Sequence, residues 1–245
     1  MIRLHLAGLA GVVALAAACS LQDPTAATAK AVSRPAASPA LRSLIGAKAW
    51  LNTSPPGPED LRGKVVLVNF WTYSCINSLR PLPYLQAWAE KYKDRGLVVI
   101  GVHTPEFAFE RDHANITRAN TALGVTYPVV VDSDYRVWRA FGNQAWPGFY
   151  FLDGDGRVRR RILGEGDYAN SERVLQQLLS EATGKPVTDP IQPVAGAGPQ
   201  MAADFDHLRS PETYLGHAQA TGFVSPGGFK RDAPSTYTTG TALDL

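Results

Sequence analysis

Residues 65–78 read VVLVNFWTYSCINS, and this stretch decides the fold. Its first seven residues are almost continuously apolar, as expected of a strand that is buried on both faces of a sheet. Cys75 follows where this strand gives way to a helix, whose apolar face includes Leu82, Leu85 and Tyr92. A buried strand followed directly by a helix predicts an α/β unit with a cysteine at its turn.

Strand and helix patterns continue to alternate along the chain. The pattern predicts further strands at residues 97–102, 127–131, 149–152 and 158–163, helices at 106–123, 133–141 and 171–182, and a hairpin turn at 153–156. We therefore expect one α/β domain at residues 45–184. Its sheet carries helices on both faces and is mostly parallel, with one antiparallel edge.

The N-terminus has the pattern of an export signal. Residues 1–18 combine a charged start with a short apolar run and small residues, as in a signal peptide. Cys19 follows at once, and small residues before a cysteine resemble the lipobox of bacterial lipoproteins, where this cysteine carries the lipid. Ordinary cleavage after Ala18 is the alternative. Residues 19–40 are rich in Ala, Ser, Thr and Pro and read as a tether to the folded domain, so we expect a periplasmic or envelope protein.

Composition excludes several classes of function. Lysine and arginine number 24 against 22 aspartates and glutamates, so no nucleic-acid footprint is indicated. The 2 cysteines cannot build a multi-disulfide scaffold or a cysteine-rich zinc site, and the 5 histidines show no metal-ligand spacing, so we predict no metal and no cofactor. No second long apolar run follows the N-terminal one, which excludes a multi-span membrane protein.

The chemistry is concentrated at Cys75. A sulfur at a helix N-terminus meets unpaired N–H groups and the positive end of the helix dipole, which both favour the reactive thiolate. Ser78 lies three residues on, so its hydroxyl is expected to face the sulfur and donate a hydrogen bond. The alternative is a buried, inert cysteine.

Several separated stretches resemble one family. They are WTYSCIN at 71–77, GVHTPEFAFE at 101–110, Trp146-Pro147 and GEGDY at 164–168. Together they resemble thioredoxin-fold envelope redox proteins of the TlpA/ResA group, and more narrowly the extracytoplasmic domain of DipZ-type proteins, which is fused to a CcdA-like membrane electron carrier. The resemblance covers residues 48–182 and implies a thioredoxin-like fold.

The resemblance assigns roles to individual residues. Cys75 matches the nucleophilic first cysteine of the C-x-x-C motif, and Pro147 matches the cis-proline that faces it, which leaves backbone groups of Trp146 for an incoming peptide. Pro83 matches the proline that kinks the active-site helix, and Pro81 removes a second backbone donor nearby. These assignments predict thiol–disulfide exchange.

Two positions depart from the family pattern. Ser78 replaces the second cysteine, which normally attacks the mixed disulfide and releases the product. A monothiol route therefore remains, in which Cys75 attacks a disulfide once and stays in the mixed disulfide until another thiol releases it. Asn69 stands six residues before Cys75, where thioredoxins have a proton-accepting aspartate, although the envelope group often has asparagine there.

Other residues near the motif are weaker candidates. Glu106 is interpreted as a carboxylate that tunes proton transfer, or simply as a charge at a helix N-terminus, and His103 as a modulator of Cys75 or a local hydrogen-bonding residue. Trp71, Tyr73 and Trp146 are interpreted as an apolar rim for extended protein segments, or as side chains packed partly in the core.

The resemblance also implies partners. A CcdA/DsbD-like membrane protein is the expected electron donor, and oxidised or mixed-disulfide envelope proteins, including apocytochrome c, are the expected clients. Two alternatives stay open: a client-binding or chaperone-like module without turnover, and a peroxiredoxin-like peroxidase. Thr72 fits the peroxidase pattern, but Val68 stands where that pattern has proline.

Residues 185–245 change character and become rich in Pro, Gly, Ala, Thr and Ser. The segment SPETYLG at 210–216 resembles the opening of the β-rich, carbohydrate-binding-like domain that follows the thioredoxin domain in DipZ-type proteins. Only 29 residues follow, too few for a β-sandwich. We expect a tail that is loosely ordered or that lies along the folded domain, and we do not assign it sugar binding.

Overall fold

A six-stranded sheet organises the computed structural model, which describes residues 38–209, 220, 222–231 and 233–238. The strands are β1 (Trp50–Leu51), β2 (Val65–Trp71), β3 (Leu97–His103), β4 (Val129–Val131), β5 (Gly148–Leu152) and β6 (Val158–Leu163), in the order β1-β4-β3-β2-β5-β6. The predicted signal peptide, Cys19, most of the tether and the segment 210–216 lie outside the described residues.

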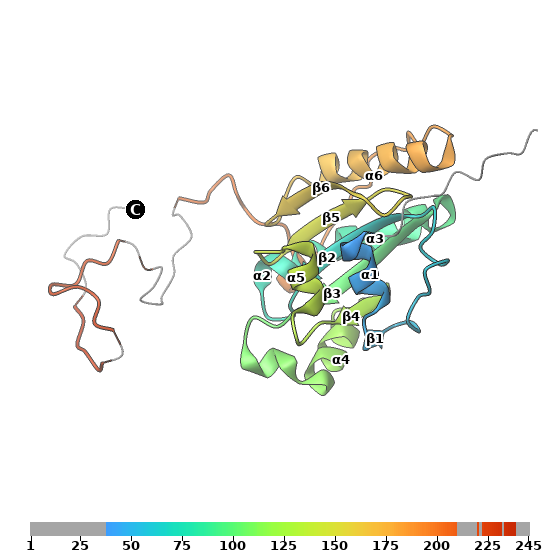
Figure 1. The fold of residues 1–245 in the computed structure, drawn as a ribbon. Helices are drawn as coiled ribbons and strands as arrows, with labels where there is room; N and C mark the ends of the chain where they lie inside the picture. The colour runs from blue at the N-terminus through green and yellow to red at the C-terminus, as the bar shows by residue number, and fades with distance from the viewer. Residues whose placement is uncertain (1–37, 210–219, 221, 232, 239–245) are drawn as a thin grey trace, which may run out of the picture. The chain divides into compact units, whose positions relative to one another are not determined.

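The sheet is parallel only at its centre. β2 pairs with β3 and β3 with β4 in parallel, whereas β1, β5 and β6 run antiparallel to their neighbours. The prediction of a mostly parallel sheet with one antiparallel edge is therefore wrong, while the mixed α/β fold with helices on both faces is confirmed. The difference arises because β5 joins the free side of β2 and starts a hairpin, and a short β1 closes the other edge (Figure 1).

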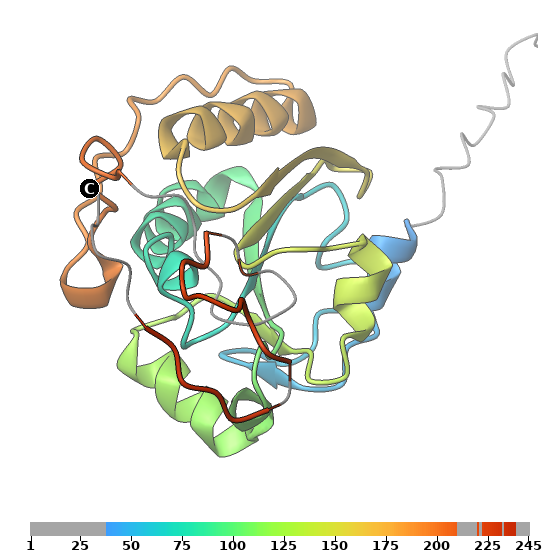
Figure 2. The same ribbon diagram turned by 90° about the vertical axis from the view of Figure 1, so that its left-hand side faces the viewer.

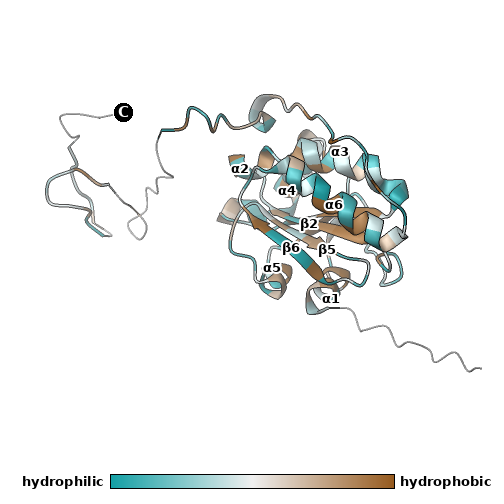
Figure 3. Ribbon diagram, turned by 90° about the horizontal axis from the view of Figure 1, so that it is seen from above, coloured by the Kyte–Doolittle hydropathy of each residue, from teal (hydrophilic) through white to brown (hydrophobic). Residues whose placement is uncertain are grey.

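Helices cover both faces of this sheet. They are α1 (Pro39–Ile45), α2 (Ile76–Leu79), α3 (Leu82–Tyr92), α4 (His113–Ala122), α5 (Arg136–Phe141) and α6 (Tyr168–Thr183), with 3₁₀ turns η1 (Lys93–Arg95), η2 (Ala108–Arg111) and η3 (Gly198–Gln200). α3, α4 and α6 lie on one face, and α1 and α5 lie on the other (Figures 2 and 3). The two parallel crossovers through α3 and α4 share one face because both are right-handed.

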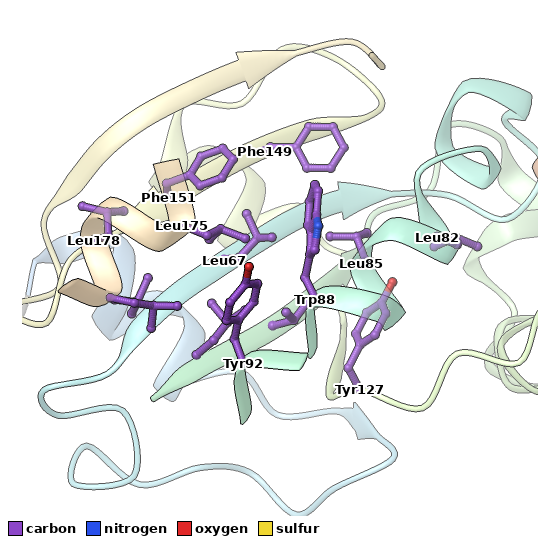
Figure 4. Close-up of a cluster of buried hydrophobic side chains, with 14 of the residues drawn as sticks. Leu67, Leu82, Leu85, Trp88, Tyr92, Tyr127, Phe149, Phe151, Leu175 and Leu178 are labelled. Carbon is purple, nitrogen blue, oxygen red and sulfur yellow. The ribbon is translucent and has the colours of Figure 1, made fainter. Parts of the chain in front are cut away.

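The central strand β2 is buried along its whole length. Its side chains alternate between two cores. Val65, Leu67 and Trp71 pack with α3 and α6 (Figure 4), and Val66, Val68 and Phe70 pack with α1 and α5. This explains the continuously apolar sequence that marked the strand.

The first helix was not predicted. α1 begins at Pro39, inside the predicted tether, after Ser38 accepts a hydrogen bond from the backbone N–H of Leu41 at 3.2 Å. Leu41 and Leu44 are buried against the sheet. The folded domain therefore begins several residues before residue 45, because a short apolar face outweighs the surrounding linker-like composition.

Two other helices differ from the prediction. The expected helix at 106–123 is split into η2 and α4, because Asp112 caps α4 by accepting from the Asn115 N–H at 3.0 Å. The active-site helix is interrupted between α2 and α3. Pro81, rather than Pro83, marks that interruption, and Pro83 lies in the first turn of α3, where a missing N–H costs nothing.

The chain after α6 remains attached to the domain at least as far as Gln200, whose side chain donates to the Leu123 carbonyl at 3.4 Å. Val187 is buried in the core beside α3 and α6. The Gln192 N–H donates to Glu172 at 2.8 Å, and Arg95 forms an ion pair with Asp189. Among the described residues, no helix is long and apolar enough to cross a membrane.

Candidate active site

Four segments that are far apart in the sequence meet at one end of the sheet. The strand register pairs Trp71 with His103 and Phe70 with Gly148, and it pairs Gly148 with Leu163. The segments that leave or enter these strand ends are the 72–78 turn, the 104–110 loop, Trp146-Pro147 and the 164–168 loop. The strand register therefore places the motifs at 71–77, 101–110, 146–147 and 164–168 at the same end of the sheet.

Cys75 lies at the N-cap position of α2. Its backbone carbonyl accepts from Ser78 N–H at 2.9 Å and from Leu79 N–H at 3.2 Å, which starts the helix. The thiol is free and half-buried, and in the described part of the chain its sulfur has no hydrogen-bond partner. The sulfur is thus open to a reaction partner.

Ser78 is turned inward. Its side chain is fully buried, and its hydroxyl oxygen accepts from the backbone N–H of Thr72 at 3.4 Å. The expected hydrogen bond from this hydroxyl to Cys75 is therefore wrong. A buried hydroxyl beside the end of β2 satisfies a strand-end N–H that would otherwise lack a partner.

Asn69 and Trp71 both lie beneath the turn. Asn69 is fully buried, its Nδ2 donates to the Phe70 carbonyl at 3.3 Å, and its Oδ1 has no partner among the described residues. Trp71 is also fully buried, so it belongs to the core, which was the alternative to a position on the rim. A central strand covered on both faces leaves no room for an exposed indole. Gly101 is required here, since a Cβ would lie 3.0 Å from the Trp71 Nε1.

Trp146-Pro147 enters β5 through a cis peptide bond, as the resemblance implied. The Pro147 carbonyl accepts from Gly164 N–H at 2.8 Å, and the half-buried Trp146 indole donates to the Thr104 carbonyl at 2.9 Å. The Trp146 ring packs on Trp138 at 4.3 Å. This segment thus joins the loops from β3 and β6 beside the reactive turn.

Glu110 is the carboxylate that organises the site, and sequence reasoning missed it. Glu110 is fully buried, whereas the predicted Glu106 is exposed. One Glu110 oxygen accepts from the Ser74 hydroxyl at 2.5 Å. The other accepts from the N–H groups of Glu106 at 2.5 Å and Phe107 at 2.8 Å. The residue directly before Cys75 is therefore tied to the loop after β3.

A capping-box signal was present in the sequence. Glu110 is the third residue of the 3₁₀ turn that Phe107 caps, and a glutamate at that position folds back onto the cap's N–H. The motif GVHTPEFAFE contains this signal, but the functional role was assigned to its first glutamate, Glu106, because that residue is closer to the end of the strand. The spacing of each glutamate from the cap residue Phe107, and not its distance from the strand, identifies Glu110 as the residue that folds back.

Electrostatics at this end are set by Glu110 and His103. Burial alone raises the pKa of Glu110, but hydrogen bonds from Ser74, Thr72 and the two amides outweigh it and hold the pKa below its ordinary value. Burial lowers the pKa of His103 to about 4, although the Glu110 charge opposes this change. The His103 ring stacks on Tyr73 at 5.4 Å, and its Nε2 lies 3.4 Å from the Thr72 hydroxyl.

The GEGDY loop braces α2 and α3. Arg80 forms an ion pair with Glu165 at 2.7 Å and also donates to the Asn77 side chain at 3.3 Å. Tyr168 stacks on Tyr84 with ring centroids 3.9 Å apart. These contacts hold the helices that follow Cys75 against the end of β6. Within the described ranges, no group of three or more His, Cys, Asp or Glu side chains could hold a metal ion.

This arrangement of sheet, helix and thiol defines a thioredoxin-fold redox protein. Comparison with known proteins agrees. The profile of the AhpC/TSA family matches residues 57–161. The solution structure of a thioredoxin-like protein in the oxidised form aligns with a TM-score of 0.50 at 32% identity, over 55% of this chain and 90% of that chain.

Two curated relatives narrow the family. DipZ from Mycobacterium tuberculosis is 41% identical over 189 residues, which are 76% of this chain but 27% of DipZ. The thiol–disulfide oxidoreductase YkuV from Bacillus subtilis is 30% identical over 138 residues, which are 56% of this chain and 93% of YkuV. The chain belongs to the family of thioredoxin-like thiol–disulfide oxidoreductases.

Proposed function

We propose that the protein exchanges disulfides through the single thiol of Cys75, with Ser78 in place of a resolving cysteine. The observation that carries this proposal is the free, half-buried thiol at the start of α2, three residues before a buried serine. Pro147 and Trp146 lie at the same end of the sheet as Cys75, where they are the proposed substrate-facing segment. Asn69 supports the 72–78 turn from its buried side.

The chemistry runs in two exchange steps. The Cys75 thiolate attacks one sulfur of a substrate disulfide, a new S–S bond forms to Cys75, and the other substrate sulfur leaves as a thiolate. Ser78 has no sulfur with which to attack this mixed disulfide. A second thiol, from a small thiol or a reduced partner protein, then attacks it and regenerates the Cys75 thiolate, so oxidation states balance.

The cellular setting is part of the same proposal. Export by residues 1–18, lipid attachment at Cys19 and a tether would hold the domain at the outer face of a membrane. A CcdA/DsbD-like membrane protein is the proposed thiol donor, and oxidised envelope proteins such as apocytochrome c are the proposed clients. The fusion partner in DipZ-type proteins supports this choice of donor.

Mass spectrometry of the adducts tests the exchange step. The reduced full chain carrying Cys19→Ser, incubated with a disulfide-bearing protein such as insulin, is expected to accumulate a mixed disulfide at Cys75, and the same chain with Cys75→Ser should form no adduct. Ser78→Cys should release that adduct and turn over insulin with a dithiol reductant. No adduct on the unchanged chain would contradict the proposal, and an inactive Ser78→Cys variant would favour the client-binding alternative.

A peroxidase is the weaker alternative. Peroxide chemistry of that type relies on a threonine hydroxyl beside the cysteine, which made Thr72 a candidate. Here the Thr72 hydroxyl interacts with His103 Nε2, at 3.4 Å, and with Glu110. That geometry supports disulfide exchange over peroxide reduction.

A further inference from the structure

Two exposed phenylalanines lie beside the reactive turn. Phe107 is 52% exposed and Phe109 is 53% exposed, although large apolar side chains are normally buried. Their rings lie parallel, with centroids 5.7 Å apart and an interplanar angle of 4°. Tyr73, two residues before Cys75, packs its ring edgewise on Phe109 at 6.2 Å. We call the rings of Tyr73, Phe107 and Phe109 the aromatic platform.

The platform is held rigidly. The Tyr73 hydroxyl and the Asn115 side chain both donate to the Phe109 carbonyl, at 3.1 and 3.2 Å. The Phe107 N–H is fixed by Glu110, whose other oxygen holds Ser74. The same buried carboxylate therefore sets the position of the rings relative to the cysteine. A surface that is ordered in advance loses little entropy when a ligand binds.

The platform is tied to the turn that carries the reactive thiol. Tyr73 lies two residues before Cys75, and Ile76, directly after Cys75, adds a further apolar side chain that is 44% exposed. A mixed disulfide places the residues that flank the substrate's cysteine within a few ångströms of Cys75. Those flanking residues are therefore the groups that meet the rings.

The charges around the turn disfavour an acidic ligand such as glutathione. Glu110 takes part in no ion pair among the described residues. Arginines near the turn already have partners: Arg80 pairs with Glu165, and Arg111 donates to the Ser133 carbonyl at 2.6 Å. Arg118, whose charge acts on Tyr73, donates to the Asn115 side chain at 2.7 Å. The carboxylates of glutathione would have to compete with these partners, whereas an apolar segment brings no such charge.

From these contacts we propose that the aromatic platform binds an extended polypeptide that carries an aromatic or long apolar side chain beside its disulfide-bonded cysteine. This inference rests on the proposed disulfide exchange and names its substrate class. Phe107 and Phe109 select the substrate, and neither takes part in the exchange of bonds.

Release of thionitrobenzoate from three probes tests the proposal on the full chain carrying Cys19→Ser. The first probe is a short peptide in which phenylalanines flank a cysteine that is disulfide-bonded to thionitrobenzoate. The second probe has serines in place of these phenylalanines. The third probe is glutathione disulfide-bonded to thionitrobenzoate. In each, Cys75 attacks the cysteine sulfur and thionitrobenzoate leaves as a coloured thiolate. We expect the first probe to react about tenfold faster than the other two.

The double variant Phe107→Ser with Phe109→Ser should reduce that ratio to about one and leave the two slower probes unchanged. Val158→Ser is the matched control, since Val158 is 43% exposed but pairs with Leu152 at the opposite end of the sheet from Cys75. A ratio near one on the unchanged chain, or a ratio that survives the double substitution, overturns the proposal.

The same probes distinguish failure of the proposed exchange from failure of the proposed substrate class. No release from any probe contradicts the exchange itself, whereas equal release from all three contradicts only the substrate class. Light scattering, which measures the mass of the protein in solution, tests whether a second copy of the chain covers the platform instead. A dimer that the double variant dissociates would assign the platform to a second copy of the chain and overturn the proposal.

Discussion

Glu110 and Glu172 are two fully buried carboxylates that the fold uses in different ways. Their side chains are exposed to 0% and 1%, and folding lowers the pKa of both because hydrogen bonds outweigh burial. Glu172 accepts from Lys91 and Tyr92 in α3, each at 2.7 Å, from Trp88 at 3.1 Å, and from the N–H of Gln192. Each carboxylate therefore ties together segments that are distant in the sequence.

The difference lies in charge compensation. Glu172 has a cation, Lys91, at 2.7 Å, so its charge is neutralised where it stands. Glu110 receives its hydrogen bonds from hydroxyls and amides, and its negative charge acts on His103 and Tyr73. Both carboxylates shift the pKa values of their neighbours, since Glu172 raises those of Lys91 and Tyr92. In the described part of the chain, only Glu110 does so without a paired cation and beside the turn that carries the reactive thiol.

The largest expected effect is at Glu172. Glu172→Ala leaves Lys91, Trp88 and Gln192 without their acceptor, so we expect the free energy of unfolding to fall by about 4 kcal/mol, measured by urea denaturation. Glu181→Ala, which removes an exposed ion pair with Arg159, is the control and should change it by less than about 0.5 kcal/mol. Equal losses in the two variants would contradict the comparison.

The next largest effect is a loss of unfolding free energy at acid pH, caused by His103 near Glu110. His103 has a folded pKa of about 4 against 6.5 for the unfolded chain, so the unfolded state takes up a proton first as pH falls. Stability should decrease by about 3 kcal/mol between pH 6.5 and pH 4, since each tenfold difference in proton affinity is worth about 1.4 kcal/mol.

His103→Phe keeps a ring against Tyr73 and removes the titration. Its urea midpoint should therefore decline less between pH 6.5 and pH 4.5 than that of the unchanged chain. The exposed His113 provides the control, because His113→Asn should leave the slope unaltered. A slope that persists in His103→Phe would assign the acid lability to other groups.

Glu110→Gln comes third. The amide keeps the shape but loses the charge-assisted hydrogen bonds, which should cost about 2 kcal/mol of unfolding free energy. It also removes the charge that raises the pKa of His103, so that pKa should fall further, as followed by NMR titration of the ring. Glu172→Gln should destabilise the protein without moving the His103 titration. A shift of equal size in both variants would remove the distinction.

The smallest effects come from a matched pair of hydroxyl deletions. Ser74→Ala and Tyr92→Phe each remove one hydroxyl donor, from Glu110 and Glu172 respectively, and Tyr92→Phe also removes an acceptor from the Gln176 side chain. We expect Ser74→Ala to lower the unfolding free energy by about 1 kcal/mol and Tyr92→Phe to lower it by somewhat more. Only Ser74→Ala loosens the residue before Cys75, so it alone should change the rate of Cys75 alkylation. Equal alkylation rates would show that Glu110 does not position the turn.

Sequence patterns predicted the centre of the fold better than its edges. β2, β3 and α3 have long apolar patterns, so local competition did not obscure them. The helix expected at 106–123 has no such pattern and is split by the Asp112 cap. The two-residue β1 and the direction of β5 depend on pairing between distant strands, and no local pattern encodes that pairing. α1 was missed because Leu41 and Leu44 form an apolar face too short to stand out from the linker around it.

The site was predicted as a set of motifs but not as a set of contacts. Cys75 and the cis peptide before Pro147 were expected on the basis of family resemblance, and the strand register explains their meeting. Trp71 and Glu106 each had two interpretations, and the sequence could not decide between them because the exposure of a side chain at a strand end depends on which loops fold over it. Glu110 is the clearest case, since its role exists only once the 72–75 turn and the 106–110 loop are adjacent.

The attachment of residues 185–192 has a practical consequence for where the domain can be cut. Secondary structure alone suggests an end at Gly184, just after α6. A chain shortened there loses Val187 from the core and the Gln192 amide from Glu172. The Gln200 side chain also bonds to the Leu123 carbonyl. Limited proteolysis of the intact protein should therefore spare the bonds up to about residue 200, and recombinant versions that end beyond that residue should be more stable than one that ends at Gly184.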